Sequence, residues 1–232
     1  MKSDWITLAA ALSQAAYLED LQRVEEVLAD PNIKGLRQIN CDKSDTQAYI
    51  LLDSQRGLIL IAIPGTASTT DILTDINAWR TCVIYRDVKI NVHAGGRIAV
   101  LSLIETVMTV IREHPRKDIL VTGHSLGGLI TQQLALEIYN RYGAYGRKIN
   151  TVTFGQPRAG NGAFKKALEA IPGEHLRFYN AADPVTWVPG LISSVFPFGR
   201  YKHAGEGMQI GDSLSHSMTR YAERIQELWG SA

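Results

Sequence analysis

The alternation of apolar and polar positions divides the chain into helices and strands. Apolar residues that recur every three or four positions predict helices, and short apolar runs bounded by turn residues predict strands. Helices are predicted over residues 4–17, 19–29, 70–79, 93–114, 126–142, 162–170 and 217–228. Strands are predicted over residues 35–41, 47–52, 58–63, 118–122, 150–154 and 176–179. Residues 80–92 and the long loop from 180 to 212 follow neither pattern.

The order of these elements predicts an α/β fold, a three-layer sandwich with helices on both faces of a central sheet. Residues 58–63 are continuously apolar, which is typical of a strand covered on both faces. A polar turn separates them from strand 47–52, so these two strands are expected to form an antiparallel hairpin. From residue 118 onward helices and strands alternate. We therefore expect one domain over residues 1–232, with a mostly parallel sheet and antiparallel strands near its N-terminus.

Composition indicates a globular protein and argues against several partners and cofactors. Hydrophobic residues make up 45% of the 232 residues, charged residues make up 20%, and the net charge is +1. A nearly neutral chain of this kind does not favour a nucleic-acid partner. Cys41 and Cys82 are too few for a disulfide framework or a metal cluster, so we expect two ordinary thiols, with their pairing left open. No metal and no cofactor is predicted.

The N-terminal stretch of residues 6–16 is rich in alanine and leucine. Polar residues interrupt it and its apolar residues follow helical spacing, so we interpret it as an amphipathic helix rather than a signal peptide. No segment reaches the ~20 apolar residues that a membrane span requires. This pattern fits a cytoplasmic protein or one secreted by a non-standard route, and it does not choose between them.

The chemistry of the chain centres on the pentapeptide Gly123-His124-Ser125-Leu126-Gly127, which lies between a predicted strand and a predicted helix. Strand, glycine-flanked serine and helix is the context of a nucleophile elbow, where a sharp turn exposes a reactive serine above a sheet. Glycines at the flanking positions remove the side chains that would collide in such a turn. The alternative is that Ser125 is only a turn residue at the start of a helix. The flanking pattern favours a nucleophile.

A nucleophilic serine needs a general base, and the base needs an acid that orients it. In α/β hydrolases the acid and then the histidine follow the serine along the chain. Asp183 and Asp212 are the two aspartates after Ser125; Asp183 follows a predicted strand closely, whereas Asp212 lies in a turn. The base must follow Asp183, which leaves His203 and His216. Chain order does not separate these two, and the position of His216 before the terminal helix favours it.

An oxyanion hole requires two preorganised N–H donors. One is expected to be the backbone N–H of Leu126, directly after the nucleophile. The second should follow an earlier central strand, and Gly65-Thr66 comes directly after strand 58–63 and Pro64. Thr66 offers both its N–H and its hydroxyl. We therefore predict that Thr66 and Leu126 stabilise the oxyanion.

Together these residues resemble the fungal-type, class 3 lipases of the α/β-hydrolase superfamily. The resemblance covers residues 45–221 in order. Its motifs are Gly123–Gly128, Pro64–Thr66, Leu73–Ile76, Val92–Gly95, Phe154–Gly160, Asn180–Pro189, Tyr201–Glu206 and His216–Tyr221. In that family the position that matches His203 lies in a structural strand, so the resemblance implies that His216 is the base.

The resemblance implies a lipase that cleaves acylglycerols or similar lipid esters through an acyl-enzyme, at a lipid–water interface. It also implies a lid region over residues 67–90. The apolar stripe of helix 70–79 would meet lipid in a lid, or pack as a small core helix. Residues 188–198 would form an acyl-binding wall, or a loop packed on itself. The substrate-binding residues predicted from these segments are Ile72, Ile76, Trp79, Val188, Leu191, Ile192 and Phe196.

Other functions fit the same scaffold. A phospholipase A1 and a short-chain or aryl carboxylesterase would use the same catalytic residues on different esters. A non-catalytic binding protein with the hydrolase fold is a more distant alternative, and the intact serine, aspartate and histidine argue against it.

Overall fold

The computed structural model describes residues 2–65, 80–143, 146–189 and 201–230. Its helices are α1 (Lys2–Ala15), α2 (Leu21–Leu28), α4 (Ala94–Glu113), α5 (Leu126–Tyr142), α6 (Gly162–Glu169) and α7 (Met218–Trp229), with short 3-10 helices η1 (Asp42–Ser44) and η2 (Pro184–Trp187). Its strands are β1 (Ile33–Cys41), β2 (Thr46–Asp53), β3 (Leu58–Ile63), β4 (Arg80–Tyr85), β5 (Val88–His93), β6 (Asp118–His124), β7 (Ile149–Phe154), β8 (Gly160–Asn161), β9 (His175–Asn180), β10 (Tyr201–Lys202) and β11 (Glu206–Gly211).

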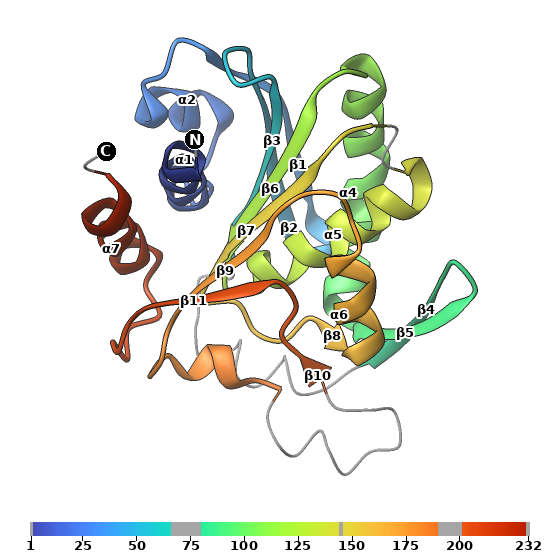
Figure 1. Cartoon of the computed structure of the whole chain (residues 1–232). Coiled ribbons are helices and arrows are strands. Elements are labelled where there is room, and N and C mark those ends of the chain that lie inside the picture. The colour runs from blue at the N-terminus through green and yellow to red at the C-terminus, as the bar shows by residue number, and fades with distance from the viewer. Residues whose placement is uncertain (1, 66–79, 144–145, 190–200, 231–232) are drawn as a thin grey trace.

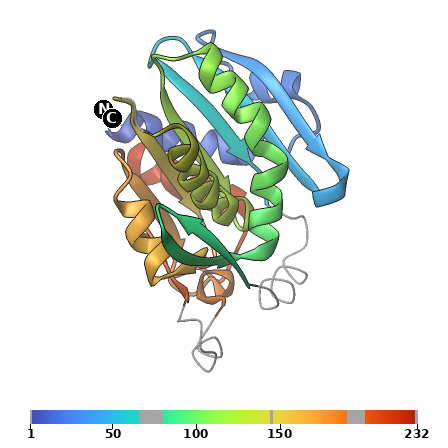
Figure 2. The same ribbon diagram turned by 90° about the vertical axis from the view of Figure 1, so that its right-hand side faces the viewer.

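These elements form three layers (Figure 1). The middle layer is a seven-stranded sheet with the order β1-β2-β3-β6-β7-β9-β11. Strands β1, β2 and β3 pair antiparallel, and every later pair in this sheet is parallel. Helices α1, α2 and α7 cover one face, and α4, α5 and α6 cover the other; Figure 2 shows α4 and α5 in front of the sheet. The predicted α/β sandwich with a mixed sheet is confirmed.

Strand β3 shows why its residues are apolar throughout. Ile59, Ile61 and Ile63 belong to the hydrophobic cluster beneath α4 and α5. Leu60 and Ala62 belong to the cluster beneath α1 and α7. Because β3 is covered on both faces, neither set of alternate positions can be polar. The strand is therefore continuously apolar. Its carboxyl end lies at the middle of one edge of the sheet, since β3 is flanked by other strands on both sides.

The sequence prediction of irregular structure over residues 80–92 is wrong. Strands β4 and β5 form a hairpin in a second, four-stranded sheet with the order β10-β8-β5-β4. The two residues of its turn, Arg86 and Asp87, both have positive φ angles of 44° and 65°. Such a turn usually contains asparagine or glycine, so the common signal for a hairpin is missing. The predicted lid region thus ends in a paired hairpin, and residues 66–79 lie outside the described part of the chain.

Strand β11 was also not predicted, because it lies within residues 180–212, which the sequence pattern assigned to a loop. It pairs in parallel with β9 and closes the edge of the large sheet. Its sequence carries a polar or glycine residue at most positions, and only Ile210 is buried. An edge strand needs little apolar surface, because one of its sides faces solvent.

Helix α4 is the element to compare with the prediction that no segment spans a membrane. Judged by length and composition, it is the only helix among the described residues that could cross a membrane. Half of its most apolar 18-residue stretch is buried within the protein. Its apolar face, which includes Val100, Leu103 and Val107, packs in the hydrophobic cluster on one side of the large sheet.

Candidate active site

The turn between β6 and α5 holds Ser125 in a backbone conformation that few non-glycine residues adopt. Its φ and ψ angles are 57° and −126°, and a positive φ at a residue with a side chain marks local strain. Hydrogen bonds on both sides fix the turn: the Ser125 N–H donates to Phe154 O at 2.9 Å, and Gly128 N–H donates to Ser125 O at 3.0 Å. The serine is fully buried. The local geometry is that of a nucleophile elbow.

The glycines around Ser125 are required by close approach of the backbone. A Cβ atom on Gly123 would lie 2.6 Å from the carbonyl carbon of Gly127, and one on Gly127 would overlap the carbonyl oxygen of Ile63. Strand β6, helix α5 and the end of β3 therefore meet with no room for a side chain. This crowding explains the glycine pattern and places Ser125 beside the loop that follows β3.

Asp183 and His216 come together at the carboxyl end of β9. The His216 Nδ1 atom lies 2.7 Å from Asp183 Oδ2, and both side chains are buried. Asp183 precedes η2, and its other carboxylate oxygen, Oδ1, accepts a hydrogen bond from Val185 N–H at 3.0 Å. The predicted acid and base thus form a hydrogen-bonded pair, with the imidazole held by one nitrogen.

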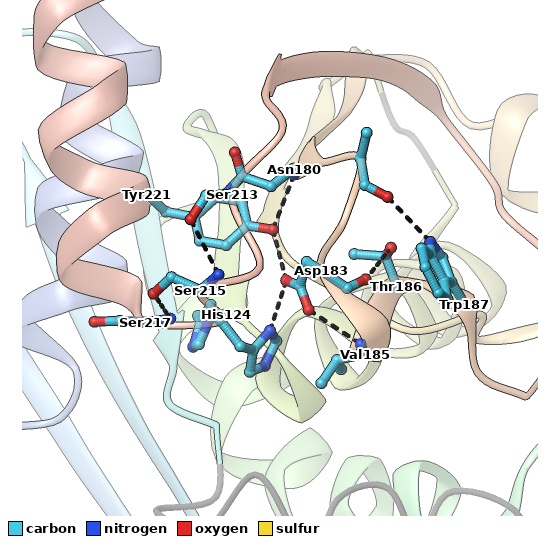
Figure 3. A network of polar contacts seen from close by, with 12 residues as sticks. His124, Asn180, Asp183, Val185, Thr186, Trp187, Ser213, Ser215, Ser217 and Tyr221 are labelled. Carbon is cyan, nitrogen blue, oxygen red and sulfur yellow. Dashed lines mark hydrogen bonds and ion pairs between the residues drawn. The ribbon is translucent and has the colours of Figure 1, made fainter.

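Tyr221 is a contact of this pair that the sequence analysis missed. Its hydroxyl donates to Asp183 Oδ2 at 2.7 Å and accepts from Asn180 N–H at 3.1 Å (Figure 3). Burial, and then the negative charge of Asp183, raise the pKa of Tyr221, so the phenol stays a donor. The signal was its spacing: Met218, Tyr221 and Ile225 form the buried stripe of α7, which directly follows His216.

The hydroxyl of Ser125 and the second imidazole nitrogen of His216 are both buried beside the elbow. Ser125 Oγ and His216 Nε2 are buried and have no hydrogen-bond partner among the residues that the structure describes. Gly155 follows the residue that anchors Ser125, and a Cβ atom there would lie 3.0 Å from Asp183 Oδ2 and 3.1 Å from His216 Cε1. Its φ of 54° also favours glycine. The end of β7 therefore brings the predicted serine, acid and base to one place.

His124 and Tyr17 form a second polar contact beside the serine. Tyr17 Oη lies 2.6 Å from His124 Nδ1 and accepts a hydrogen bond from Gly65 N–H at 3.0 Å. Burial, and then the nearby His216, lower the pKa of His124 to about 3, while burial raises the pKa of Tyr17 to about 12. Both groups are neutral at neutral pH, so no second cation opposes a charged His216. Nothing in the sequence pattern indicated this role of Tyr17.

The two rival residues have other roles. His203 Nε2 lies 2.8 Å from Thr186 O, and burial, followed by the charges of Arg177 and Arg158, lowers its pKa to about 3. Asp212 is exposed and accepts a hydrogen bond from Gln209 Nε2. Neither side chain makes a hydrogen bond to Asp183 or His216 among the described residues.

The described residues include only part of the predicted oxyanion hole. Leu126 is the first residue of α5, directly after Ser125, and a Cβ atom on Gly65 would lie 2.9 Å from Ser125 Cβ. The loop after β3 therefore runs against the serine. Thr66 lies outside the described residues, as do the predicted pocket residues Ile72, Ile76, Trp79, Leu191, Ile192 and Phe196.

Val188 is the predicted pocket residue that the structure describes. It is partly buried, and its carbonyl oxygen accepts a hydrogen bond from Arg158 N–H at 2.8 Å. Cys41 and Cys82 are free thiols. Among the described residues no group of three or more His, Cys, Asp or Glu side chains is placed to hold a metal ion.

Comparison with known proteins places this arrangement in a family. The model of the family described as lipase (class 3) matches residues 60–192, more than half of the chain. A lipase of Rhizomucor miehei is 31% identical over 176 residues, which cover 73% of this chain and 46% of that protein. A lipase of Rhizopus niveus is 31% identical over 152 residues, which cover 63% of this chain and 38% of that protein. The chain thus spans about half or less of the length of these two relatives.

Solved structures agree with this comparison. The triacylglyceride lipase of Rhizomucor miehei superposes with a TM-score of 0.74 at 25% identity, covering 90% of this chain and 80% of that one. A further solved triacylglycerol lipase, with a TM-score of 0.73 at 25% identity, covers 89% of this chain and 79% of its own, and was described as having a serine protease triad as its catalytic centre. The relatives also include a secreted mono- and diacylglycerol lipase of Gibberella zeae, 34% identical over 112 residues that cover 48% of this chain and 33% of that protein.

Proposed function

The chain belongs to the class 3 lipase family, and from that premise we propose that it is a serine hydrolase that cleaves carboxylic esters of lipids. Ser125 is the nucleophile, His216 the general base and Asp183 the residue that orients the base. Leu126 and Thr66 supply the oxyanion hole. The observation that carries the proposal is a buried serine at a strained elbow, next to a histidine whose other nitrogen is held by a buried carboxylate.

The reaction follows from these positions. His216 Nε2 takes the proton of Ser125 Oγ as that oxygen attacks the ester carbonyl, and the carbonyl oxygen becomes the oxyanion. Backbone N–H donors aimed at this oxygen stabilise it in a site that excludes water. Collapse of the intermediate expels the alcohol, which takes the proton from His216 and leaves an acyl-serine. Water, deprotonated by His216, then releases the fatty acid and restores Ser125.

Asp183 and Tyr221 act on the base rather than on the substrate. The carboxylate fixes the proton of His216 on Nδ1, so that Nε2 is free to accept the proton of the serine. The Tyr221 hydroxyl and the Val185 N–H hold the two carboxylate oxygens in place. Because both carboxylate oxygens have hydrogen-bond partners, Asp183 keeps its orientation toward His216 when the imidazole takes up the proton of the serine.

Labelling with a fluorophosphonate probe tests the proposal. The probe should modify the wild-type protein, and Ser125→Ala should abolish both labelling and hydrolysis of p-nitrophenyl butyrate while the protein stays folded. Ser54→Ala is the matched control, because Ser54 lies in an exposed turn where its hydroxyl contacts Asn32 O. Labelling that survives in Ser125→Ala would refute the assignment of the nucleophile. An unlabelled wild-type protein would point to a binding protein.

Acylglycerols are the proposed substrates. The family and the names of the relatives support this choice, as do the apolar residues of segments 70–79 and 188–198 in the sequence. A panel of tributyrin emulsion, phosphatidylcholine and phenyl acetate separates the lipase from a phospholipase A1 and an aryl esterase. A rate that rises once tributyrin exceeds its solubility supports a lid that includes helix 70–79. A rate that saturates below that limit indicates an esterase without lid gating.

A further inference from the structure

A cavity of about 740 Å³ lies away from the candidate active site, between the tip of the β4–β5 hairpin and helix α6. Its apolar wall comes from the buried Tyr85 and Ile90 of the hairpin, the exposed Val88, and Ala163 and Ala167 of α6. The cavity opens to the surface and shares no lining residue with the Ser125–His216–Asp183 site. It is therefore a separate feature of the molecule.

Cations surround this apolar wall. Arg86, Lys165, Lys166 and Lys202 line the cavity, and no aspartate or glutamate is among its described lining residues. Lys165 forms an ion pair with Glu169, and the Arg86 guanidinium lies 4.7 Å from the ring centroid of Tyr139. Within the described ranges, Lys166 and Lys202 have no ion-pair partner. This local excess of positive charge contrasts with a net charge of only +1 for the chain.

The hairpin adds exposed apolar side chains beside these cations. Ile84 is 67% exposed and Val88 is 52% exposed. Ile84 pairs across the hairpin with Lys89, which is also exposed. Asp87 is the one carboxylate of the hairpin tip. Exposed apolar side chains flanked by lysine and arginine are the features with which peripheral proteins bind anionic lipid surfaces.

We propose that the β4–β5 hairpin and the cavity beside it form a docking surface for lipid bilayers that carry anionic headgroups. The headgroup phosphate lies among Arg86, Lys166 and Lys202, and Val88, on the cavity side of the hairpin, enters the acyl region. Charge complementarity selects this occupant, because an uncharged partner would leave the lysines with no favourable contact. The inference rests on the proposed function for the presence of a lipid surface, but the binding itself does not need catalysis.

Sedimentation with vesicles tests the docking surface. The protein carries Ser125→Ala, so that no lipid is cleaved. It should bind vesicles of phosphatidylcholine and phosphatidylglycerol more tightly than vesicles of phosphatidylcholine alone, and added salt should weaken this preference. Each lysine near an anionic surface strengthens binding about fivefold, so Lys166→Gln with Lys202→Gln should weaken binding to the anionic vesicles about 30-fold.

Lys117→Gln with Lys148→Gln is the matched control, since these lysines flank the amino ends of β6 and β7 at the other end of the sheet. It should bind the anionic vesicles nearly as well as the parent protein. Val88→Ser should weaken binding to both kinds of vesicle. Equal binding to the two kinds of vesicle, or equal losses in the two double variants, overturns the proposal. Ser125 labelling in the wild type reports separately on the proposed function, so the two failures are distinguishable.

Discussion

The two sheets of this protein differ in what surrounds them. The strands of the large sheet lie between two layers of helices, and its central strands are buried on both faces. The small sheet contains β8 and β10, of two residues each, and a hairpin whose outer side chains meet solvent. Ser125, Asp183 and His216 lie at the carboxyl end of the large sheet. Stability and chemistry should therefore depend on the large sheet, and surface contacts on the small one.

Removal of the charge at the end of β9 should have the largest effect. Asp183→Asn should lower kcat/KM on p-nitrophenyl butyrate about 10⁴-fold, because an amide donor at this position favours the wrong tautomer of His216. Asp212→Asn is the control, since Asp212 is exposed and contacts Gln209. A loss of less than tenfold in Asp183→Asn would show that the acid lies elsewhere.

A cavity in the core of the large sheet should have the next largest effect. Phe178 is fully buried on β9, with its ring centroid 5.5 Å from that of Phe154 and 5.4 Å from that of Trp229. Phe178→Ala should lower the free energy of unfolding by about 3–5 kcal/mol in urea titrations. The control in the small sheet is Val83→Ala, at a partly buried position. Equal losses in the two variants would contradict the contrast between the sheets.

Tyr221→Phe removes one donor from the acid and should have a smaller effect on the chemistry. Loss of a hydrogen bond to a charged group costs about 1.5 kcal/mol, which corresponds to about a tenfold fall in kcat. Tyr179→Phe is the control. A lower melting temperature with an unchanged kcat would show a purely structural role.

Sequence patterns revealed the large sheet because burial on both faces leaves a strong apolar signal. Strand β3 and helix α5 have the bounds that were predicted. The hairpin and β11 escaped because exposed or edge strands carry polar residues at most positions. The triad candidates were found because each lies beside a recognisable strand or helix. Tyr17 and Tyr221 were not, because their contacts join residues 107 and 38 positions apart. The helical spacing of Tyr221 indicates that it is buried, but not which group its hydroxyl contacts.

The buried His124 at the end of β6 should make stability depend on pH. Burial lowers its pKa to about 3 in the folded protein, whereas an exposed imidazole has a pKa of 6.5. The unfolded chain therefore takes up a proton near pH 6.5 and the folded chain does not, so the stability is full above pH 6.5 and is lost as the pH falls toward 3. From pH 6.5 to 5.5, the wild type should lose about 1 kcal/mol more than His124→Gln in urea titrations. Parallel curves would show that His124 binds protons equally in the folded and unfolded states.

The smallest effect is expected at the outer face of the hairpin, where the contrast between the sheets is sharpest. Ile84 is an apolar residue on a strand, as Ile61 is, but Ile84 is 67% exposed and Ile61 is fully buried. Ile84→Ser removes little buried surface, so the free energy of unfolding should stay within about 0.5 kcal/mol of the wild type. Ile61→Ala should cost about 2–5 kcal/mol. A large loss in Ile84→Ser would mean that this face is covered in the folded protein, and hence that the hairpin is part of the core rather than a surface open to lipid.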